Sequence, residues 1–477
     1  MKFVYEEFVT DILHSYWKAM NGSRILNKES RRKKGIATFA SLIKKMCMKK
    51  ILVYVFLSVC AGTAWAQSAK EEIAKNPALA AGKYYAYQKP EDSLTLPPEG
   101  YEPFYISTFA RHGSRYLTKP EKYERPMAVL RTAQEHGALT ATGMKVLKII
   151  EALAGEAEGR YGELTPKGRQ QHRELVKRMF RNYPEIFGSG IHVDAHSTYK
   201  TRTFLSMAAA CVELKGLNPA LDITMDASEH DAYYIKYKNP EYEKEHLREA
   251  DKVYRLADSV YVYPSRLMQC LFRNREYAEH IDSVSLMLDL FELHGISQSG
   301  YRQQDLSFLF SSDELYDLWQ RNNFEWYYEK GASPLSGACM YKLERNLLEN
   351  FILTADSVIA SGLPAATLRY GHDTNLAPLA VLMGIDKLSA STSDWQKIAD
   401  TYRTYRIIPM AGNIQLVFFR KKDNFQDIIV KLMLNEREVS LPVDTDMSPY
   451  YPWREVRAYW KRIIDGITLP AFVRKTD

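Results

Sequence analysis

Short apolar runs, separated by helical patterns, divide most of the chain into alternating strands and helices. The first run, Phe104 to Phe109, leads directly into Arg111-His112-Gly113. Similar runs at Ile191 to His196 and at Ala366 to Tyr370 each enter a polar turn. Strands that alternate with helices predict an α/β fold, with a mainly parallel sheet flanked by helices.

The helices expected between these strands have recognisable ends. One covers about Gly143 to Ala157, and the next opens at Thr165-Pro166 and runs to about Asn182. Threonine is a good N-cap, and proline suits the first helical position. A third helix carries Leu343, Leu347, Leu348 and Phe351, and two later strands are expected at Ile414 to Phe419 and Ile428 to Leu434.

Residues 225–340 differ from the rest, because they are rich in Tyr, Glu and Lys and contain several helical patterns. Within them, Ser311 and Glu314 resemble a capping box at the start of a helix. We therefore expect a smaller, mostly helical insertion or cap over 225–340, and an α/β core built from 67–224 and 341–477. The first part of that core, 67–100, has few periodic apolar positions and is expected to be a polar lead-in.

The first 66 residues are expected to be a leader. Met48-Lys49-Lys50 begins a basic segment, Ile51 to Ala61 is apolar, and Ala64-Trp65-Ala66 supplies a small-x-small cleavage pattern. This is the layout of a secretory signal peptide over 48–66, which predicts a periplasmic or secreted protein starting near Gln67. The 47 residues before Met48 favour Met48 as the true start. The alternative is a membrane anchor behind a cytoplasmic tail, for which the apolar run is short.

The net charge of the whole chain, +6, comes from this leader. Residues 1–66 hold 12 Lys and Arg against 4 Asp and Glu, so 52 basic and 54 acidic residues follow them. A nearly neutral body gives no reason to expect nucleic-acid binding. After the leader, Cys211, Cys270 and Cys339 form no C-x-x-C pair, so neither a disulfide framework nor a structural zinc site is expected, although one bridge remains open.

Charged residues follow three of the expected strands. Arg111-His112 ends the first, Ser197 to Arg202 follows the second, and His372-Asp373 ends the third. In parallel α/β sheets, ligands bind beyond the carboxyl ends of the strands. The sequence therefore predicts one site where these three segments meet.

Arg111-His112-Gly113-Ser114-Arg115 has the chemistry of a phosphate site. Guanidinium groups offer planar sets of donors that match phosphate oxygens. Neighbouring cations also lower the pKa of a histidine between them, which keeps the imidazole neutral and its lone pair ready to attack phosphorus. The alternative is a loop whose arginines make surface ion pairs, and the apolar strand before the motif argues against it.

Four segments of the chain resemble the histidine acid phosphatases, a branch of the histidine phosphatase superfamily. They are Arg111-His112-Gly113-x-Arg115, Gly162 to Gly168, Ser197 to Thr203 and His372 to Leu376, in the order of that family. The resemblance implies a phosphoglycerate-mutase-like core that hydrolyses small phosphomonoesters through a phosphohistidine. It also implies no metal or other cofactor, and no stable membrane association is expected once the leader is cleaved. The resemblance is weaker between about 225 and 340.

The resemblance also implies a role for each site residue. His112 would be the nucleophile, and Asp373 would protonate the leaving alkoxide. The phosphoryl oxygens would be held by Arg111, Arg115, Arg202 and His372. Such roles suit phosphoryl transfer, which depends on positioning and charge stabilisation. A helix dipole would favour the carboxylate of Asp373, so the activity is expected to favour acidic pH.

The substrate is indicated by the residues after Arg115. Thr118 and Lys119 follow at the spacing of phytases, where such residues contact additional phosphates, but Leu117 replaces their usual proline. Tyr116 resembles the multiple inositol polyphosphate phosphatases, which often have a glutamate motif where this chain has His372-Asp373. Inositol polyphosphates such as phytate are therefore expected, with sugar phosphates or phosphoproteins as alternatives. The alternative for Lys119 is a solvated loop lysine.

Three other functions fit parts of the sequence. His192-x-Asp194-x-His196 puts metal-capable side chains on one strand face, but no partner cluster completes a metallohydrolase site. A non-catalytic binder of phosphorylated ligands on the same scaffold would need neither His112 nor Asp373. A phosphoryl-transferring mutase would serve cytoplasmic metabolism, which the expected signal peptide argues against.

Overall fold

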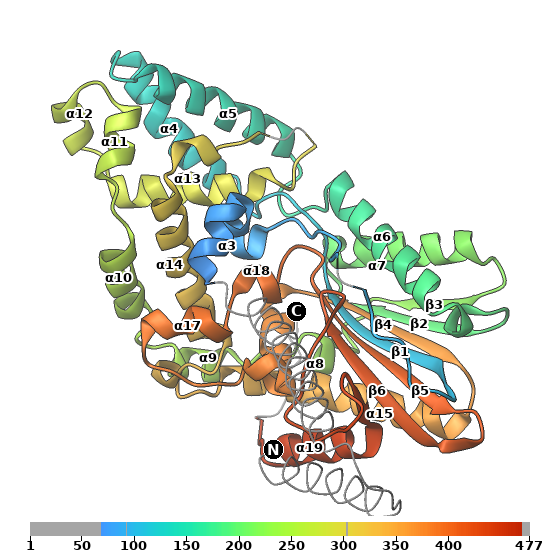
Figure 1. The fold of residues 1–477 in the computed structure, drawn as a ribbon. Coiled ribbons are helices and arrows are strands. Elements are labelled where there is room, and N and C mark those ends of the chain that lie inside the picture. The colour runs from blue at the N-terminus through green and yellow to red at the C-terminus, as the bar shows by residue number, and fades with distance from the viewer. Residues whose placement is uncertain (1–67, 92, 302–303, 470–477) are drawn as a thin grey trace, which may run out of the picture. The chain divides into compact units, whose positions relative to one another are not determined.

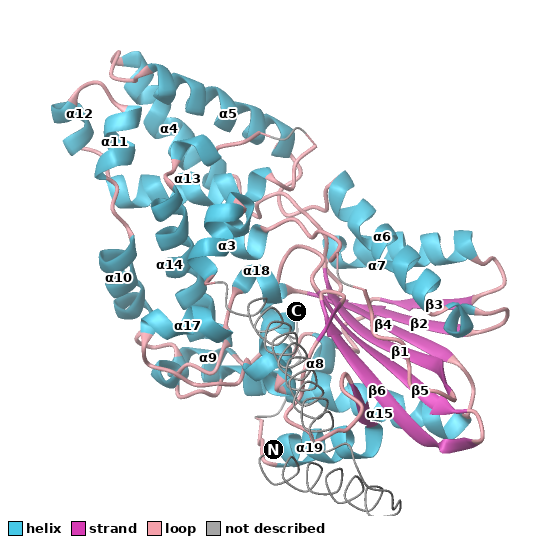
Figure 2. Cartoon of the chain, in the orientation of Figure 1, coloured by secondary structure: helices cyan, strands magenta, loops and turns pink. Residues whose placement is uncertain are grey.

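The computed structural model describes residues 68–91, 93–301 and 304–469 (Figure 1). The predicted leader, 1–66, and the predicted mature start at Gln67 lie outside the described residues. The strands gather in one sheet, and much of the remaining described chain is helical (Figure 2). Among the described residues there is no helix with the length and apolar character that a membrane crossing requires.

One eight-stranded sheet is the centre of the described chain. Its strands are β1 (Tyr101–Arg111), β2 (His192–Ser197), β3 (Asp222–Asp226), β4 (Ala365–Gly371), β5 (Asn413–Lys421), β6 (Asn424–Leu434), β7 (Arg437–Glu438) and β8 (Tyr450–Pro452). Their order is β3-β2-β4-β1-β5-β6-β7, and β8 also pairs with β6. The strands expected from the sequence are β1, β2, β4, β5 and β6, with ends that differ by a few residues.

The two halves of this sheet differ in strand direction. β3, β2, β4 and β1 run parallel to one another, whereas β5 pairs antiparallel with β1 and β6, and β7 and β8 pair antiparallel with β6. The α/β fold with flanking helices is confirmed, but the sheet is mixed. Its parallel half is the one that carries the three polar strand ends. β5 and β6 are antiparallel because only Lys422 and Asp423 connect them, and so short a connection permits a hairpin alone.

Helices cover both faces of the sheet (Figure 1). α6 (Pro166–Asn182) and α7 (Thr201–Leu217) pack on one face, and α15 (Arg345–Ser361), α16 (Asp373–Met383) and α19 (Trp453–Asp465) pack on the other. Successive residues of β1 point to opposite faces, so Ile106 contacts the first group and Tyr105 the second. The N-cap predicted for α6 is confirmed, since Thr165 Oγ1 accepts from the backbone nitrogen of Gly168 at 3.2 Å.

The remaining helices come from several stretches of chain. They are α3 (Ala69–Lys75), α4 (Glu121–Glu135), α5 (Ala141–Ala157), α8 (Ala232–Ile235), α9 (Pro240–His246), α10 (Ala250–Tyr261), α11 (Ser265–Leu271), α12 (Arg275–Glu279), α13 (Ser283–Ser297), α14 (Ser312–Lys330), α17 (Trp395–Thr401) and α18 (Thr404–Ile407), with 3-10 segments η1 (Pro77–Tyr84), η2 (Pro184–Phe187), η3 (Ser307–Leu309), η4 (Pro334–Ser336), η5 (Met340–Glu344) and η6 (Ile385–Lys387). The capping box predicted at Ser311 and Glu314 is confirmed at the start of α14. α3, η1, α4 and α5 share a hydrophobic cluster with α11, α13 and α14. The limits 225–340 of the insertion stay a prediction.

The polar lead-in expected over 67–100 is wrong for its first part. α3 and η1 bury Ala69, Ile73 and Ala80, and Tyr84 at the end of η1 is 6% exposed. Alanine gives a weak hydrophobic pattern, so the sequence did not reveal these helices. The correction matters for function, because η1 reaches the site described below.

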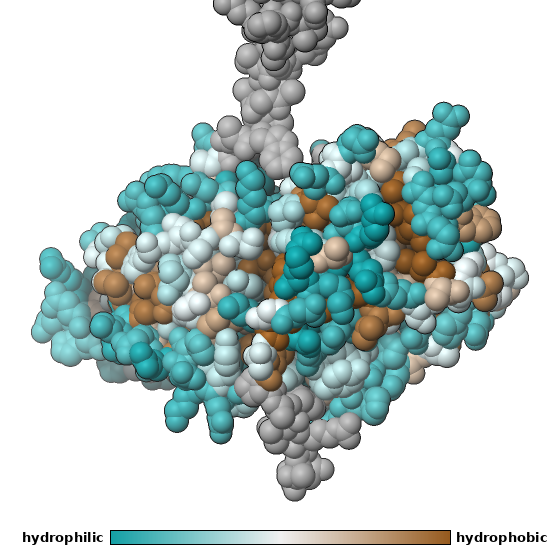
Figure 3. Space-filling model, turned by 90° about the horizontal axis from the view of Figure 1, so that it is seen from below, coloured by the Kyte–Doolittle hydropathy of each residue, from teal (hydrophilic) through white to brown (hydrophobic). Residues whose placement is uncertain are grey.

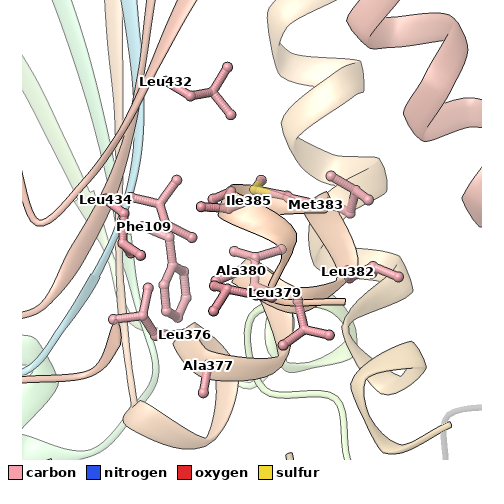
Figure 4. Packing of buried hydrophobic residues seen from close by; sticks show 14 of the residues in the cluster. Phe109, Leu376, Ala377, Leu379, Ala380, Leu382, Met383, Ile385, Leu432 and Leu434 are labelled. Carbon is pink, nitrogen blue, oxygen red and sulfur yellow. The ribbon is translucent and has the colours of Figure 1, made fainter. Parts of the chain in front are cut away.

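α16 is held firmly against the sheet. Leu376, Leu379 and Ala380 are fully buried, and Figure 4 shows Leu376 and Ala380 facing the ring of Phe109 from β1. Burying one leucine side chain contributes roughly 1.5–3 kcal/mol. Because α16 begins at Asp373, directly after β4, this packing fixes the position of that residue.

The face of the molecule seen in Figure 3 is mainly hydrophilic, with scattered hydrophobic residues. Exposed large hydrophobic side chains include Leu96, Val212 and Phe425. Cys211, Cys270 and Cys339 are free thiols, so the bridge that the sequence left open is absent from the described residues.

Candidate active site

The turn after β1 is held by close backbone packing. The backbone nitrogen of His112 donates to the carbonyl of Gly371 at the end of β4, at 3.0 Å. A Cβ atom on Gly113 would lie 2.3 Å from the carbonyl oxygen of Gly168, and one on Gly168 would lie 2.2 Å from that of Ser114. Only glycine fits at either position, so the start of α6 and the Arg-His-Gly turn can meet backbone to backbone.

His112 lies at the centre of this turn and is 1% exposed. Its Nδ1 lies 2.9 Å from the carbonyl oxygen of Gly113. Because a carbonyl can only accept, Nδ1 carries the proton, and the lone pair of the neutral ring is on Nε2. Nε2 has no hydrogen-bond partner among the described residues.

The surroundings of His112 keep its ring neutral. Burial is the largest cause, and the charges of Arg111, Arg202 and Arg115 add to it, so the pKa of His112 is well below its ordinary value. The predicted effect of the neighbouring cations is confirmed in direction. Burial, which the sequence did not show, contributes more.

Arg111 is fully buried at the end of β1. Its Nη1 donates to the carbonyls of Lys83 at 2.5 Å and Ile408 at 2.6 Å. Its Nη2 lies 2.6 Å from Oδ2 of Asp373. Burial lowers the pKa of Arg111 to about 10 while Asp373 opposes the shift, so the guanidinium remains charged at neutral pH.

Asp373 is the first residue of α16, and 13% of its side chain is exposed. Burial by itself raises the pKa of this carboxyl. The positive charges of Arg111, Arg115 and Lys83 outweigh burial and hold the pKa far below its usual range. Asp373 is therefore ionised in the free protein, and His372, not Asp373, occupies the N-cap position.

α7 brings Arg202 to the same place. Arg202 Nη2 lies 3.4 Å from Nδ1 of His372, and Nε2 of His372 lies 3.1 Å from Oγ1 of Thr198. Because a guanidinium cannot accept, Nδ1 of His372 accepts and its Nε2 donates to Thr198. Burial, helped by Arg202, lowers the pKa of His372 to about 3, so this ring is also neutral. The ring centres of His372 and His112 are 5.6 Å apart.

Arg115 adds a further cation from the far side of the turn. It is 8% exposed, and its Nη1 donates to the carbonyl of Tyr116 at 2.8 Å. Its guanidinium lies 5.7 Å from the ring centre of Tyr84. The charge of Arg115 lowers the pKa of both His112 and Asp373, so it acts on the same small volume.

The three arginines share an unusual feature. The Nε atoms of Arg111, Arg115 and Arg202 are buried and have no hydrogen-bond partner among the described residues. A buried donor without a partner costs free energy, and a charged donor costs more. Three such donors around one histidine favour an anionic ligand with several acceptor oxygens.

Most of the residues predicted from the sequence meet in this cluster, namely Arg111, His112, Arg115, Arg202, His372 and Asp373. Thr118 and Lys119 are exposed and lie outside it. Thr118 and Arg202 both border Gly162, since a Cβ on that glycine would lie 3.5 Å from Thr118 Cγ2 and 3.9 Å from Arg202 Nη1. A role for Thr118 and Lys119 in binding stays a prediction.

Lys83 and Tyr84 also reach the site, although the sequence singled out neither. The hydroxyl of Tyr84 donates to Glu292 of α13 at 2.6 Å. Lys83 Nζ lies 5.4 Å from the ring centre of Tyr84 and 5.2 Å from that of Trp326. No local motif marks these residues, because only the docking of η1 against the core brings them here.

The metal-binding pattern on β2 is occupied by hydrogen bonds. His192 Nδ1 lies 2.9 Å from Asp222, and the ring nitrogens of His196 lie 2.9 Å from Asp194 and 2.7 Å from Asp231. His196, Asp226 and Asp231 bring one possible ligand atom each within 4.8 Å of one another. The carboxylates already engage both nitrogens of His196, so the group is satisfied without a metal.

A pocket of about 360 Å³ lies elsewhere, where Leu94 and Thr95 cover α6 and strands β5 and β6. None of the predicted site residues lines it. The chemical features of the chain, buried arginines around a neutral histidine, are at the strand ends instead.

Comparisons with known proteins agree on one family. The model of the histidine phosphatase superfamily, branch 2, matches residues 106–435. Multiple inositol polyphosphate phosphatase 1 of Gallus gallus is 22% identical over 451 residues, which cover 88% of this chain and 94% of that relative.

Solved structures share the fold. The apo form of the Bifidobacterium longum multiple inositol polyphosphate phosphatase has a TM-score of 0.64 at 19% identity, and the match covers 80% of this chain and 97% of that one. The phytase from D. castellii has a TM-score of 0.58 at 13% identity, with coverage of 82% and 86%.

The family match spans more than half of the chain and includes the Arg-His-Gly turn, Arg202 and His372-Asp373. It therefore covers every strand end that contributes to the cluster. The chain belongs to the histidine phosphatase superfamily, branch 2, and is a phosphoric monoester hydrolase.

Proposed function

We propose that the chain hydrolyses phosphomonoesters at the cluster around His112, through a phosphohistidine formed on Nε2. The state of His112 carries this proposal, because the ring is neutral and its Nδ1 donates to Gly113, which leaves the lone pair on Nε2. A neutral imidazole can attack phosphorus, and the buried arginines beside it suit the phosphoryl oxygens.

The reaction has two steps in this proposal. In the first, Nε2 of His112 attacks phosphorus while the bond to the alcohol oxygen breaks, and Asp373 gives its proton to that oxygen. An alkoxide is a poor leaving group, so this proton lowers the barrier. In the second step, water attacks phosphorus, returns a proton to Asp373 and releases phosphate from His112. Arg111, Arg115 and Arg202 stabilise the charge on the non-bridging oxygens in both steps.

His372 belongs to the same group of residues that would bind the phosphoryl oxygens. In the free protein its ring accepts from Arg202 and donates to Thr198, so it positions Arg202. It would hold a phosphoryl oxygen by turning its N–H from Thr198 toward the substrate. Both uses place His372 beside the phosphoryl group.

Asp373 needs a proton before it can act as an acid. In the free protein the ion pair with Arg111 keeps it ionised. A bound phosphate monoester offsets the charge of the same arginines and so raises the pKa of Asp373. Turnover should therefore increase toward acidic pH, where the bound complex is protonated at Asp373.

The proposed substrates carry several phosphates, and inositol polyphosphates such as phytate are the proposed class. Lys83 lowers the pKa of Asp373, and Lys236 and Lys238 lower that of His372, so further cations lie near both residues. Because Asp373 protonates the leaving oxygen, Lys83 lies on the side of the leaving alcohol and can attract its remaining phosphates. The names of the relatives support the same class.

The proposed setting is outside the cytoplasm, because residues 48–66 have the layout of a signal peptide. Protein isolated from the periplasm or the medium should begin at Gln67. Retention of the full chain in the cytoplasm would contradict export and leave the phosphatase proposal intact.

Phosphate release from a panel of esters tests the function. The panel contains phytate, a sugar phosphate, phosphotyrosine and an aryl phosphate, at acidic and neutral pH, with wild type, His112→Ala and His136→Ala. His136 is an exposed histidine at the end of α4 and is the matched control. Release should be fastest with phytate at acidic pH and absent in His112→Ala alone. Substantial turnover by His112→Ala would overturn the catalytic proposal, and a preference for sugar phosphates would overturn the proposed substrate class.

A further inference from the structure

A buried carboxyl and a buried amide meet behind the first turn of α16. Glu344, the N-cap residue of α15, is 3% exposed, and Asn375 is 4% exposed. Asn375 Nδ2 donates to Glu344 Oε1 at 3.0 Å. The two remaining oxygens, Glu344 Oε2 and Asn375 Oδ1, are buried and have no partner among the described residues.

An ionised Glu344 would fit these surroundings poorly. The positive charge of Lys330 in α14 favours a negative charge at this position and the negative charge of Glu243 in α9 opposes it, but neither residue forms an ion pair with Glu344 in the described chain. A buried carboxylate with one hydrogen bond and no adjacent cation is strongly disfavoured. Proteins avoid that state by taking up a proton.

A single proton between Glu344 Oε2 and Asn375 Oδ1 would give both unpartnered oxygens a hydrogen bond. Placed on Glu344 Oε2, it could be donated to Asn375 Oδ1, while Asn375 Nδ2 continues to donate to Oε1. We propose that Glu344 is a protonated carboxylic acid that forms a cyclic acid–amide pair with Asn375, and that this pair positions the first turn of α16. Separately, burial raises the pKa of Glu344 to about 8, which agrees with an uncharged acid at acidic and neutral pH.

The pair is linked to the site through the backbone of that turn. The backbone nitrogen of Asn375 lies 3.2 Å from the carbonyl oxygen of His372, and that of Leu376 lies 3.0 Å from it. Asp373 lies within the same turn, with its carboxyl 2.6 Å from Arg111. Holding the side chain of Asn375 therefore holds the backbone that carries His372 and Asp373. Glu344 is a positioning residue in this account, and its effect on turnover rests on the proposed role of Asp373.

The proton itself can be observed without any activity. An infrared difference spectrum between wild type and Glu344→Gln, recorded at pH 6, should contain the C=O stretching band of a protonated carboxylic acid that shifts in D2O. Glu349→Gln changes a partly exposed glutamate of α15 that bonds to Arg345, and it is the matched control, so its difference spectrum should lack the band assigned to Glu344. A carboxylate band from Glu344 at pH 6 would overturn the proposal, whatever the activity of the protein.

The positioning role is tested by two neutral replacements. Glu344→Gln keeps two hydrogen bonds to the amide of Asn375, whereas Glu344→Leu keeps none. We expect the Gln variant to retain turnover within roughly twofold. The Leu variant should lose roughly tenfold or more in kcat for an alkyl ester, with KM little changed, because a small displacement of Asp373 slows proton transfer. An aryl ester, which needs less proton donation, should lose less. Equal activity of the Gln and Leu variants on the alkyl ester would overturn the positioning role.

The pH profile separates this role from simple packing. Above the pH at which Asp373 loses its proton, the remaining activity of the wild type should fall a second time as Glu344 ionises, and the Glu344→Gln variant should lack this second fall. A second fall of the same size in both proteins, or in neither, would contradict a proton-dependent pair. If wild type showed no phosphatase activity, the proposed function would fail, while the infrared result would still decide the state of Glu344.

Discussion

The two sides of the first turn of α16 show how a buried carboxyl acquires its charge. On the site side, Asp373 lies 2.6 Å from a guanidinium nitrogen of Arg111 and is ionised, although burial favours its neutral form. On the interior side, burial raises the pKa of Glu344 to about 8, and the hydrogen bond from the neutral amide of Asn375 opposes this shift without reversing it. Burial favours the neutral form of both groups, and only Asp373 has an adjacent cation that outweighs burial, so this cation accounts for the difference in charge.

The same contrast separates function from stability. The site side contains cations whose Nε donors have no partner in the described chain, and these donors are available to a phosphate. The interior side can satisfy its polar atoms with a single proton. Substitutions on the site side should therefore act directly on turnover. Substitutions on the interior side should act on stability and its pH dependence, and on turnover less strongly, through the first turn of α16.

Among variants that keep the nucleophile His112, the largest effect is expected from Asp373→Asn. Loss of the proton donor should lower kcat for an alkyl ester such as glycerol phosphate by roughly 10²–10⁴-fold. An aryl ester with a good leaving group should lose far less. Steady-state kinetics on the two esters measures the difference, and equal losses would remove Asp373 from the role of acid.

The next effect concerns a single phosphate donor. Arg202→Met should lower kcat/KM by roughly 10²–10³-fold on every ester, because the arginine acts on the transferred group itself. Arg173→Met replaces a half-exposed arginine of α6 near Glu213 and is the matched control. A loss with Arg202→Met no larger than that of the control would place Arg202 outside the reaction.

The pH dependence of stability tests the comparison directly. The folded-state pKa of Glu344 is raised from 4.5 to about 8, so its stabilising contribution is fully present below about pH 4.5 and is lost as the pH rises toward 8. Relative to Glu344→Gln, wild type should lose up to a few kcal/mol, roughly, in free energy of unfolding between pH 5 and pH 8. Urea unfolding of both proteins measures this loss.

Asp373 should behave in the opposite way. The folded-state pKa of Asp373 is lowered, so its stabilising contribution is present above the unfolded pKa and disappears as the pH falls below about 4.

For Glu344, a stability difference between wild type and Glu344→Gln that stays constant from pH 5 to pH 8 would show that this residue does not titrate as inferred.

A smaller, selective effect is expected from Lys83→Met. Removing this charge should raise KM for phytate by roughly tenfold or less and leave an aryl monophosphate almost unchanged, since a partly exposed charge is screened. Equal effects of Lys83→Met on both substrates would contradict a contact with the leaving alcohol.

Lys119→Met, in the exposed loop after β1, tests the role in substrate binding that the sequence predicts for this lysine.

The smallest effect should come from chelation. Protein cations supply the positive charge around the proposed phosphoryl position, so EDTA should leave turnover unchanged within error. Loss of activity that zinc restores would favour the metal alternative on β2.

The sequence predicted the parts of the site that are encoded locally. Arg111 and His112 follow an apolar strand, and His372 and Asp373 follow another, so their meeting at one sheet edge was a consequence of strand order. The N-cap of α6 and the capping box of α14 could also be predicted from the sequence, because helix capping depends on a few neighbouring residues.

The remainder depends on tertiary contacts that no local pattern records. Lys83 and Tyr84 lie in a weakly patterned segment, and only the docking of η1 brings them to Arg111 and Arg115. The burial that dominates the pKa of His112 is also a property of the assembled fold. The antiparallel half of the sheet departs from the predicted parallel pattern, because the two-residue connection between β5 and β6 forms a hairpin.

The most direct test of the central claim is to trap the covalent intermediate. Wild type mixed rapidly with a labelled phosphomonoester and quenched during turnover should contain an acid-labile, alkali-stable phosphoryl group on the peptide that carries His112, and His112→Ala should contain none. Turnover without any phosphoenzyme, or a label on another residue, would contradict His112 as the nucleophile.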